Sequence, residues 1–242
     1  MTSSSLHFGM NVKRFCNSLN ALIKNTRFFD VLSGYFYSSG FKAIYPSLEN
    51  TEKIRILVGI STDYKTFAQV QSAKELASSE VGKVYASSVK NELEHAEDSI
   101  DTEESVLKFK EWLKSGRIEV RAYPDEKIHS KVYIMTFNQD AIDKGRVITG
   151  SSNFTQSGLV NNIEFNVELK DEADYNYALE RFEELWEDGV DLSERYVKTI
   201  DEETWLTDKV TPYELYLKFL FVKIDLSRHY VQNFRRKNSQ LL

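Results

Sequence analysis

The sequence is poor in the residues that form disulfides and bind transition metals. Its 242 residues include one cysteine and four histidines. One cysteine cannot form an internal disulfide, and Cys16 lies in an amphipathic run, so we predict a buried apolar residue in a reducing compartment. His95 lies beside Glu92 and Glu94, but an acidic run of this kind is usually a solvated helix face. We therefore predict no metal and no cofactor.

Long apolar runs are also missing, and so is an excess of positive charge. No run reaches the length that crosses a bilayer, and the first residues, MTSSSLHFGMN, lack the order of a secretory signal. We therefore predict a cytoplasmic protein with no membrane partner. The formal net charge of -6 excludes a uniformly basic nucleic-acid binder, although a local basic groove is compatible with it. Gly82 and Lys83 lack the spacing of a P-loop, which excludes an ATPase motor.

Apolar residues follow helical spacing in some stretches and extended spacing in others. KIRILVGI, residues 53–60, is nearly continuous in apolar character, which indicates a strand buried on both faces between layers of helices. Strands separated by helices, followed by a hairpin and a further strand, predict an α/β fold, an α/β/α sandwich with a mixed β-sheet. The expected helices are residues 11–24, 38–44 and 171–187, with two or three more between 62 and 114, and the expected early strands are residues 28–37, 53–60 and 117–123.

A hairpin is predicted from two strand-like runs, residues 127–135 and 146–151, which flank a polar segment that favours a turn. If the hairpin folds about Ala141, His129 lies opposite Asn153, and Lys131 lies opposite Ser151. Alternation places Ile128, Val132 and Ile134 on one face and His129, Lys131 and Tyr133 on the other. Tyr133 then either stacks on a base or sugar or simply packs in the core.

A third run, residues 163–169, alternates strictly between apolar and polar side chains. Alternation predicts that Ile163, Phe165, Val167 and Leu169 face the core, whereas Glu164, Asn166 and Glu168 face polar partners. The hairpin and this strand together form a poor metal site but a good anion site, because lysine and asparagine donate to phosphate oxygens. A neutral histidine nitrogen can attack phosphorus, and a glutamate can hold the proton on the other ring nitrogen.

Three motifs resemble those of the phospholipase D superfamily, particularly its nuclease branch. They are HSK at residues 129–131, GSSNFT at residues 150–155 and NIE at residues 162–164. The resemblance implies a phospholipase D-like fold in which His129 is the nucleophile, Lys131 and Asn153 hold the phosphate and Ser151 assists. It also implies that Glu164 orients the histidine and that the reaction needs no metal.

The resemblance has two departures and one implication for assembly. Thr136 stands where the family usually has aspartate, and the segment between Lys131 and Gly150 is longer than usual. The family builds its active site from two such motifs, and this chain has one. We therefore predict a homodimer with two copies of His129 at a two-fold axis. One copy would attack phosphorus, and the other would protonate the leaving oxygen.

The order of the early strands, together with TPYELYLK at residues 211–218, resembles the domain ahead of the motor in bacterial superfamily-two helicases of the Swi/Snf type. We predict a phospholipase D-like domain at residues 1–190 and a C-terminal helical extension at residues 191–242 that leads into a helicase domain. The predicted function is a metal-independent phosphodiesterase or nuclease acting on DNA. The alternatives are an inactive dimerisation or DNA-docking module, and lipid headgroup hydrolysis.

Overall fold

The chain divides into two compact units, Met1–Leu206 and Thr207–Leu242. The computed structural model describes residues 6–7, 12–34, 36, 38–59, 100–123 and 128–203, all of them in the first unit. The TPYELYLK segment of the predicted helical extension, residues 211–218, and the helices predicted between residues 62 and 99 lie outside the described residues. Among the described helices, none is long and apolar enough to span a membrane.

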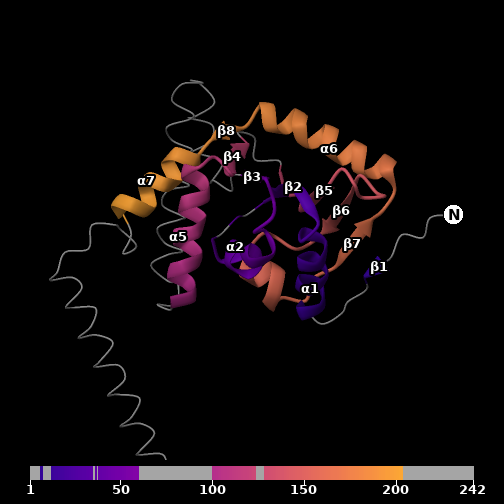
Figure 1. Cartoon of the computed structure of the whole chain (residues 1–242), viewed down its shortest axis with the longest axis horizontal. Coiled ribbons are helices and arrows are strands. Elements are labelled where there is room, and N and C mark those ends of the chain that lie inside the picture. The colour runs from indigo at the N-terminus through magenta and orange to yellow at the C-terminus, as the bar shows by residue number, and fades with distance from the viewer. Residues whose placement is uncertain are drawn as a thin grey trace, which may run out of the picture. The chain divides into compact units, whose positions relative to one another are not determined.

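One mixed sheet organises the first unit (Figure 1). Three adjacent strands, β2, β3 and β4, run parallel to one another, and all other neighbouring strands pair antiparallel. This topology confirms the predicted α/β fold with a mixed sheet. In spatial order the strands are β1 (Leu6–His7), β7 (Asn166–Leu169), β6 (Gly145–Gly150), β5 (Val132–Phe137), β2 (Thr26–Ser33), β3 (Lys53–Gly59), β4 (Ile118–Tyr123) and β8 (Val190–Asp191).

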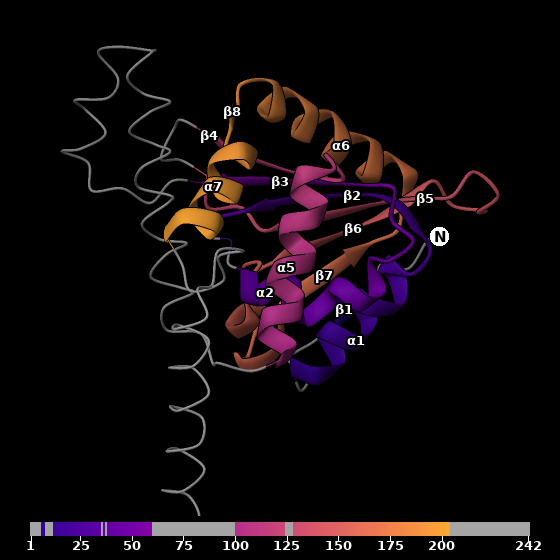
Figure 2. The same ribbon diagram turned by 60° about the vertical axis from the view of Figure 1, so that its left-hand side comes forward.

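The larger core lies on the face of the sheet that carries most of the helices, as Figure 2 shows for α1, α2 and α5. These helices bury apolar side chains such as Leu19, Phe41 and Phe109 against Phe29 of β2 and Tyr133 of β5. The helices concerned are α1 (Val12–Ile23), α2 (Ser38–Ile44), α5 (Ile100–Lys114) and α7 (Ser193–Glu203), with a 3-10 turn at Tyr45–Ser47 and a π-helical turn at Ser157–Asn161.

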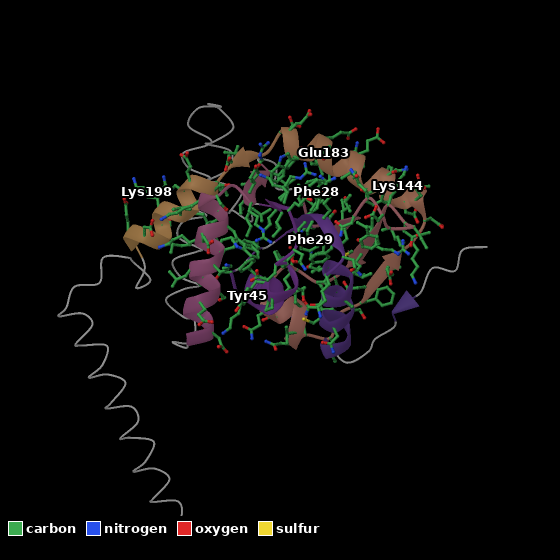
Figure 3. The ribbon with its side chains drawn as sticks, in the orientation of Figure 1. Phe28, Phe29, Tyr45, Lys144, Glu183 and Lys198 are labelled. Carbon is green, nitrogen blue, oxygen red and sulfur yellow. The ribbon has the colours of Figure 1, made fainter. Side chains whose placement is uncertain are left out.

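The opposite face is covered by α6 (Glu172–Glu187), which packs Phe182 and Trp186 on the strands. Arg55 of β3 links this helix to the sheet, because its guanidinium forms ion pairs with Asp30 of β2 at 2.6 Å and with Glu183 of α6 at 2.7 Å. Figure 3 marks Glu183 on α6 above the strand that carries Phe29. Strands β2 and β3 are thus buried between two helical layers, as the continuous apolar character of residues 53–60 predicts for β3.

The predicted burial of Cys16 is confirmed, and the structure decides between the two alternatives for Tyr133. Cys16 is buried on α1, and burial raises the pKa of its thiol, an effect that the hydrogen bond from Asn20 only partly offsets. Tyr133 is fully buried, stacks on Phe29 and donates to the backbone oxygen of Ser152 at 2.8 Å. Because the ring of Tyr133 lies inside the core, it packs there and does not stack on a base.

The predicted hairpin register is wrong by one residue. Thr136 pairs with Gly145 and Val132 with Thr149, and the amide of Gly150 donates to the oxygen of Lys131 at 3.3 Å. Lys131 therefore lies opposite Gly150 and not Ser151. Phe137 and Lys144 pair across the loop, and an even number of residues lies between them. The midpoint of the hairpin therefore falls between two residues and not on Ala141. His129 and Lys131 also precede β5 instead of lying within it.

The alternation predicted for residues 163–169 is confirmed for the three polar side chains, which have polar partners, and for Leu169, which packs on the smaller core, but it is wrong for Ile163 and Phe165. Ile163 and Phe165 precede β7 and expose 89% and 46% of their surface, whereas Asn166 and Glu168 are buried. Glu168 is held by the guanidinium of Arg146 at 3.5 Å. Asn166 and Glu168 are buried because their polar groups have hydrogen-bonding or charged partners there. At this end of the strand, those contacts stabilise the fold more than burial of Ile163 and Phe165 would.

The strand β8 and the helix α7 extend the first unit past residue 190, the predicted boundary. Leu192, Tyr196 and Ile200 belong to the larger core, and β8 pairs with β4. The division of the chain into a phospholipase D-like part and a helical extension stays a prediction.

Candidate functional site

The candidate site lies along a row of strand ends, where β2, β3 and β6 end and where β5 and β7 begin. This row of strand ends is called the site edge. Leu32 at the end of β2 pairs with Val132 at the start of β5, and Gly150 at the end of β6 pairs with Asn166 at the start of β7. Segments that are far apart in the sequence therefore meet at one edge. All five site residues predicted from the sequence, His129, Lys131, Ser151, Asn153 and Glu164, lie in the loops at this edge.

The segment before β5 carries His129 and Lys131. Ile128 is buried and anchors this segment, and its carbonyl oxygen lies only 2.6 Å from the point where a Cβ on Gly59 would stand. Glycine is needed at that position for the two backbones to approach. The ammonium of Lys131 donates to the carbonyl oxygen of His129 at 2.6 Å. The imidazole of His129 is exposed and makes no hydrogen bond to any residue that the structure describes.

Asn153 sits in a tight turn after β6. Its carbonyl oxygen accepts from the amide of Thr155 at 2.8 Å, and the hydroxyl of Thr155 accepts from the amide of Gly158 at 3.0 Å. A Cβ on Gly158 would stand 2.8 Å from the amide nitrogen of Asn153, so the turn closes only around glycine. The side chain of Asn153 is half-buried, and its Oδ1 accepts from the hydroxyl of Ser33 at 3.4 Å.

Lys131 and Asn153 come together beside Gly34, the residue that follows β2. A Cβ on Gly34 would stand 3.5 Å from Oδ1 of Asn153 and 3.7 Å from Nζ of Lys131. One cationic donor and one amide therefore face the same small region at the end of β2. An ammonium and the NH₂ group of an amide are both donors of the kind that phosphate oxygens accept from, although the Asn153 atom nearest this region is the acceptor Oδ1.

Ser151 and Glu164 form a second part of the site. The hydroxyl of Ser151 donates to Oε2 of Glu164 and accepts from the amide of Phe165 at 3.0 Å. The other carboxylate oxygen, Oε1, accepts from the side-chain amide of Asn162 at 3.3 Å. Glu164 thus binds Ser151 and Asn162 and makes no hydrogen bond to His129, so its orienting role stays a prediction.

Buried hydrogen bonds beneath the site hold its loops together. The side-chain amide of Asn166 donates to the hydroxyl of Ser152 at 2.8 Å, and both residues are buried. Burial raises the pKa of Tyr133 well above its usual range, and the negative charge of Glu164 acts in the same direction. The phenol therefore stays protonated and keeps its bond to the backbone of Ser152.

Thr136, which stands in place of the family aspartate, lies within β5 and away from these loops. Its hydroxyl shares a hydrogen bond of 2.8 Å with the phenol of Tyr175 on α6. Its contact is therefore structural. In the part of the chain that the structure describes, no three histidine, cysteine or acidic side chains gather to hold a metal ion.

Ser33 and Gly34 contribute to the site, but the motifs alone do not identify them. Both belong to FFDVLSGYFY, residues 28–37, which indicates a strand that ends in a tight turn. One feature of the sequence points to Ser33. It is a small polar residue at the end of a predicted strand, and ligands often bind at strand ends in α/β sheets.

The fold is an α/β domain with a mixed sheet, and its site loops carry the three motifs that resemble those of the phospholipase D superfamily. A family model described as "Cardiolipin synthase, PLD-like domain" matches residues 19–186. The match spans more than half of the chain, and the chain therefore belongs to this family of phospholipase D-like domains. Members of the superfamily act on phosphodiesters.

Solved structures of low identity are similar in fold. NucT from Helicobacter pylori is 13% identical with a TM-score of 0.45, over 78% of this chain and 98% of that one. The phospholipase D family member Nuc from Salmonella typhimurium is 15% identical with a TM-score of 0.40, over 72% and 88%. A phosphatidylserine synthase from Haemophilus influenzae Rd KW20 is 16% identical with a TM-score of 0.44, over 88% and 43%. No curated protein matched the sequence.

Proposed function

We propose that the chain is a metal-independent phosphodiesterase that cleaves DNA through a phosphohistidine intermediate. The observation that carries this proposal is the meeting of the Lys131 ammonium and the Asn153 amide beside Gly34, in a chain with the family's three motifs. The exposed imidazole of His129 lies two residues from Lys131 and is open to a substrate. DNA is the proposed substrate because the motifs resemble the nuclease branch of the superfamily.

The proposed reaction has two steps. A neutral nitrogen of His129 attacks phosphorus, the bond from phosphorus to the leaving oxygen breaks, and a protonated imidazole gives that oxygen its proton. Water then attacks the phosphohistidine, the P–N bond breaks, and the second imidazole takes the proton of the water. Lys131 and Asn153 hold the phosphate oxygens and offset their charge. One neutral and one protonated imidazole are needed together, so the rate falls at both low and high pH.

The second imidazole comes from a second copy of the chain in this proposal. This chain carries one copy of the histidine motif, HSK at residues 129–131, and the apolar side chains of Ile163 and Phe165 are exposed on either side of Glu164. Exposed apolar side chains beside a half-site support an isologous contact between two copies.

His129→Ala tests the proposed function directly. Labelled single- and double-stranded DNA is incubated with the protein in a chelator, and we expect cleavage that His129→Ala lowers by at least about a thousandfold, because the nucleophile is lost. Ser130→Ala is the matched control, since Ser130 is the exposed neighbour with no proposed role. Loss of wild-type cleavage in chelator, or full activity of His129→Ala, would contradict the mechanism.

A second candidate function is a DNA-docking module without catalysis. The engagement of Glu164 by Ser151 and Asn162, and not by His129, favours it. Such a module would bind DNA with an affinity that falls as salt rises, and His129→Ala would leave that affinity unchanged. For either function we propose that the domain works within a DNA-processing protein of the helicase or restriction type.

A further inference from the structure

We propose that Asn166 is a positioning residue, whose buried side-chain amide fixes the backbone of Ser152 and with it the directions of the neighbouring site residues Ser151 and Asn153. This inference rests on the proposed function, in which Asn153 holds a phosphate oxygen. Asn166 is the first residue of β7 and lies outside the three motifs.

The side-chain amide of Asn166 binds Ser152 at two points. Its Nδ2 donates to the hydroxyl oxygen of Ser152 at 2.8 Å, and its Oδ1 accepts from the backbone amide of Ser152 at 3.5 Å. A backbone N–H group can only donate, so the oxygen of the carboxamide has to face it and the NH₂ group has to face the hydroxyl. Both residues are buried, so the two contacts are shielded from water.

The third polar group of Ser152, its carbonyl oxygen, accepts from the phenol of Tyr133 at 2.8 Å. Tyr133 lies on β5 and Asn166 on β7, the two strands that flank β6 in the sheet. Side chains from both neighbouring strands therefore bind every polar group of Ser152. The backbone of Ser152 cannot turn without breaking at least one of these buried hydrogen bonds, which is costly.

Fixing Ser152 also fixes the residues on either side of it. Ser151 is exposed, Ser152 is fully buried and Asn153 is half-buried, so the side chain between the two site residues is the one that points inward. A turn of the Ser152 backbone would redirect the hydroxyl of Ser151 and the carboxamide of Asn153 together. Polar groups that are aimed before the substrate binds stabilise a developing charge without reorganisation.

Gly150, the first residue of the GSSNFT motif, makes the contact between Asn166 and Ser152 possible. It pairs with Asn166 across β6 and β7, and a Cβ on Gly150 would stand 2.5 Å from Oδ1 of Asn166. The carboxamide therefore occupies space beside the backbone of Gly150 that a side chain would fill. A glycine of the motif and an asparagine outside it thus act together on the site loop.

Two substitutions of Asn166 separate hydrogen bonding from packing. Asn166→Leu keeps the size of the side chain and removes both contacts, so we expect kcat/KM for DNA cleavage to fall by about 10- to 100-fold, the effect of two lost hydrogen bonds. Asn166→Asp keeps both contacts, because its second oxygen accepts from the Ser152 hydroxyl when ionised and donates to it when protonated. We expect this variant to retain at least about a third of the wild-type kcat/KM.

A double-mutant cycle tests whether Asn166 acts through Ser152. Ser152→Ala removes only the hydroxyl contact, so we expect a smaller loss of kcat/KM, about 3- to 10-fold. In the Asn166→Leu background the same change should cause no further loss. Asn20→Leu is the control, because the amide of Asn20 donates to the sulfur of Cys16 at 3.4 Å on α1, outside the site loops. Equal losses from Ser152→Ala in both backgrounds, or an Asn166→Asp variant as inactive as Asn166→Leu, would overturn the proposal.

The NMR signals of the backbone N–H groups of Ser151 and Asn153 give a measurement that needs no cleavage. We expect them to shift or broaden in Asn166→Leu, to return close to their wild-type positions in Asn166→Asp and to stay unchanged in Asn20→Leu. If Asn166 only stabilises the fold, Asn166→Leu unfolds at lower urea concentration but keeps these signals in place, and that result overturns the proposal. If the wild type cleaves no DNA, the proposed function fails while these signals still decide the role of Asn166.

Discussion

Gly34 and Gly150 both stand at strand ends beside the candidate site, yet an added methyl group meets different surroundings at each. At Gly34 the nearest atoms lie 3.5 Å away, which is ordinary contact. At Gly150 the methyl group would stand 2.5 Å from Oδ1 of Asn166 and even closer to the backbone oxygen of Phe165. Atoms so close in a packed strand pair have no room to move.

Substituting each of these glycines by alanine separates binding from stability. We expect Gly34→Ala to keep its free energy of unfolding within about 0.5 kcal/mol and to weaken phosphate binding, because the methyl group enters the space beside Lys131. We expect Gly150→Ala to lose about 1–3 kcal/mol of stability through overpacking. Urea denaturation and titration with inorganic phosphate measure the two effects. A strongly destabilised Gly34→Ala would contradict this assignment of space.

The motifs brought the candidate site residues to one set of loops, but they did not determine which residues lie beside them. His129, Lys131 and Asn153 stand in motifs, and the hairpin around them follows from turn residues between two apolar runs. The pairing of Lys131 was wrong by one residue because a loop of unknown conformation fixes register only to the nearest residue. Ser33 was not predicted, because its contact with Asn153 joins segments that only the three-dimensional fold brings together.

The helices α5 and α7 are joined by a small ion-pair cluster around Asp201. Its carboxylate accepts from Lys110 at 2.9 Å and from Lys114 at 3.2 Å. Partial burial acts to raise the pKa of Asp201, but the hydrogen bonds and positive charges of the two lysines outweigh it and lower the pKa below 3.8. The contact between the two helices therefore depends on an ionised carboxylate.

Acid is expected to weaken this contact. The pKa of Asp201 is lower in the folded protein than the value of 3.8 in the unfolded chain. Asp201 therefore stabilises the fold fully at pH values above 3.8, and this stabilisation is lost as the pH falls through the pKa of the folded protein. We expect Asp201→Asn to lower the free energy of unfolding by about 0.5–1.5 kcal/mol at pH 7 and by less at pH 3, in urea titrations. Glu202→Gln, an exposed change on the same helix, should have no such effect. A loss for Asp201→Asn that does not vary with pH would argue against this account.

At the scale of elements, the sequence predicted whether a segment is a helix or a strand better than it predicted which side chains the segment buries. The strand β3 and the helices α1, α2 and α6 match their predicted ranges closely, because long periodic patterns reflect burial on a defined face. At β7 the predicted polar partners of Asn166 and Glu168 are present, and Leu169 packs on the smaller core as predicted. Ile163 and Phe165 were predicted to face the core but precede the strand and are exposed. The strands β1 and β8 are too short to have a periodic signal.

The whole molecule is predicted to work as a dimer, and Ile163 offers the sharpest test. Ile163→Lys places a charge on an exposed apolar residue at the site edge, so we expect the dimer to dissociate in analytical ultracentrifugation and DNA cleavage to fall with it. Ile142→Lys is the matched control, because Ile142 is a fully exposed isoleucine in the hairpin loop at the other end of β6. A wild-type monomer at micromolar concentration, or a stable Ile163→Lys dimer, would contradict the arrangement.

Fold class followed from the alternation of strands and helices, since that order leaves few arrangements for a sheet with two buried faces. Assembly did not follow in the same way. The need for a second histidine came from the resemblance to a family. The exposure of Ile163 and Phe165 is a property of the folded chain, because both residues precede β7 instead of lying within it.

The short outer strands restrict how two copies of this domain can meet. In the described part of the chain, β1 and β8 each contribute two residues, so the sheet ends at both sides in a strand with little backbone left for pairing. Through these two described strands, two copies have little backbone with which to join their sheets into one continuous ribbon. A contact made by the described residues therefore relies on side chains at the strand ends or on the helices, which makes it sensitive to single surface substitutions and leaves the backbone hydrogen bonds of each sheet intact.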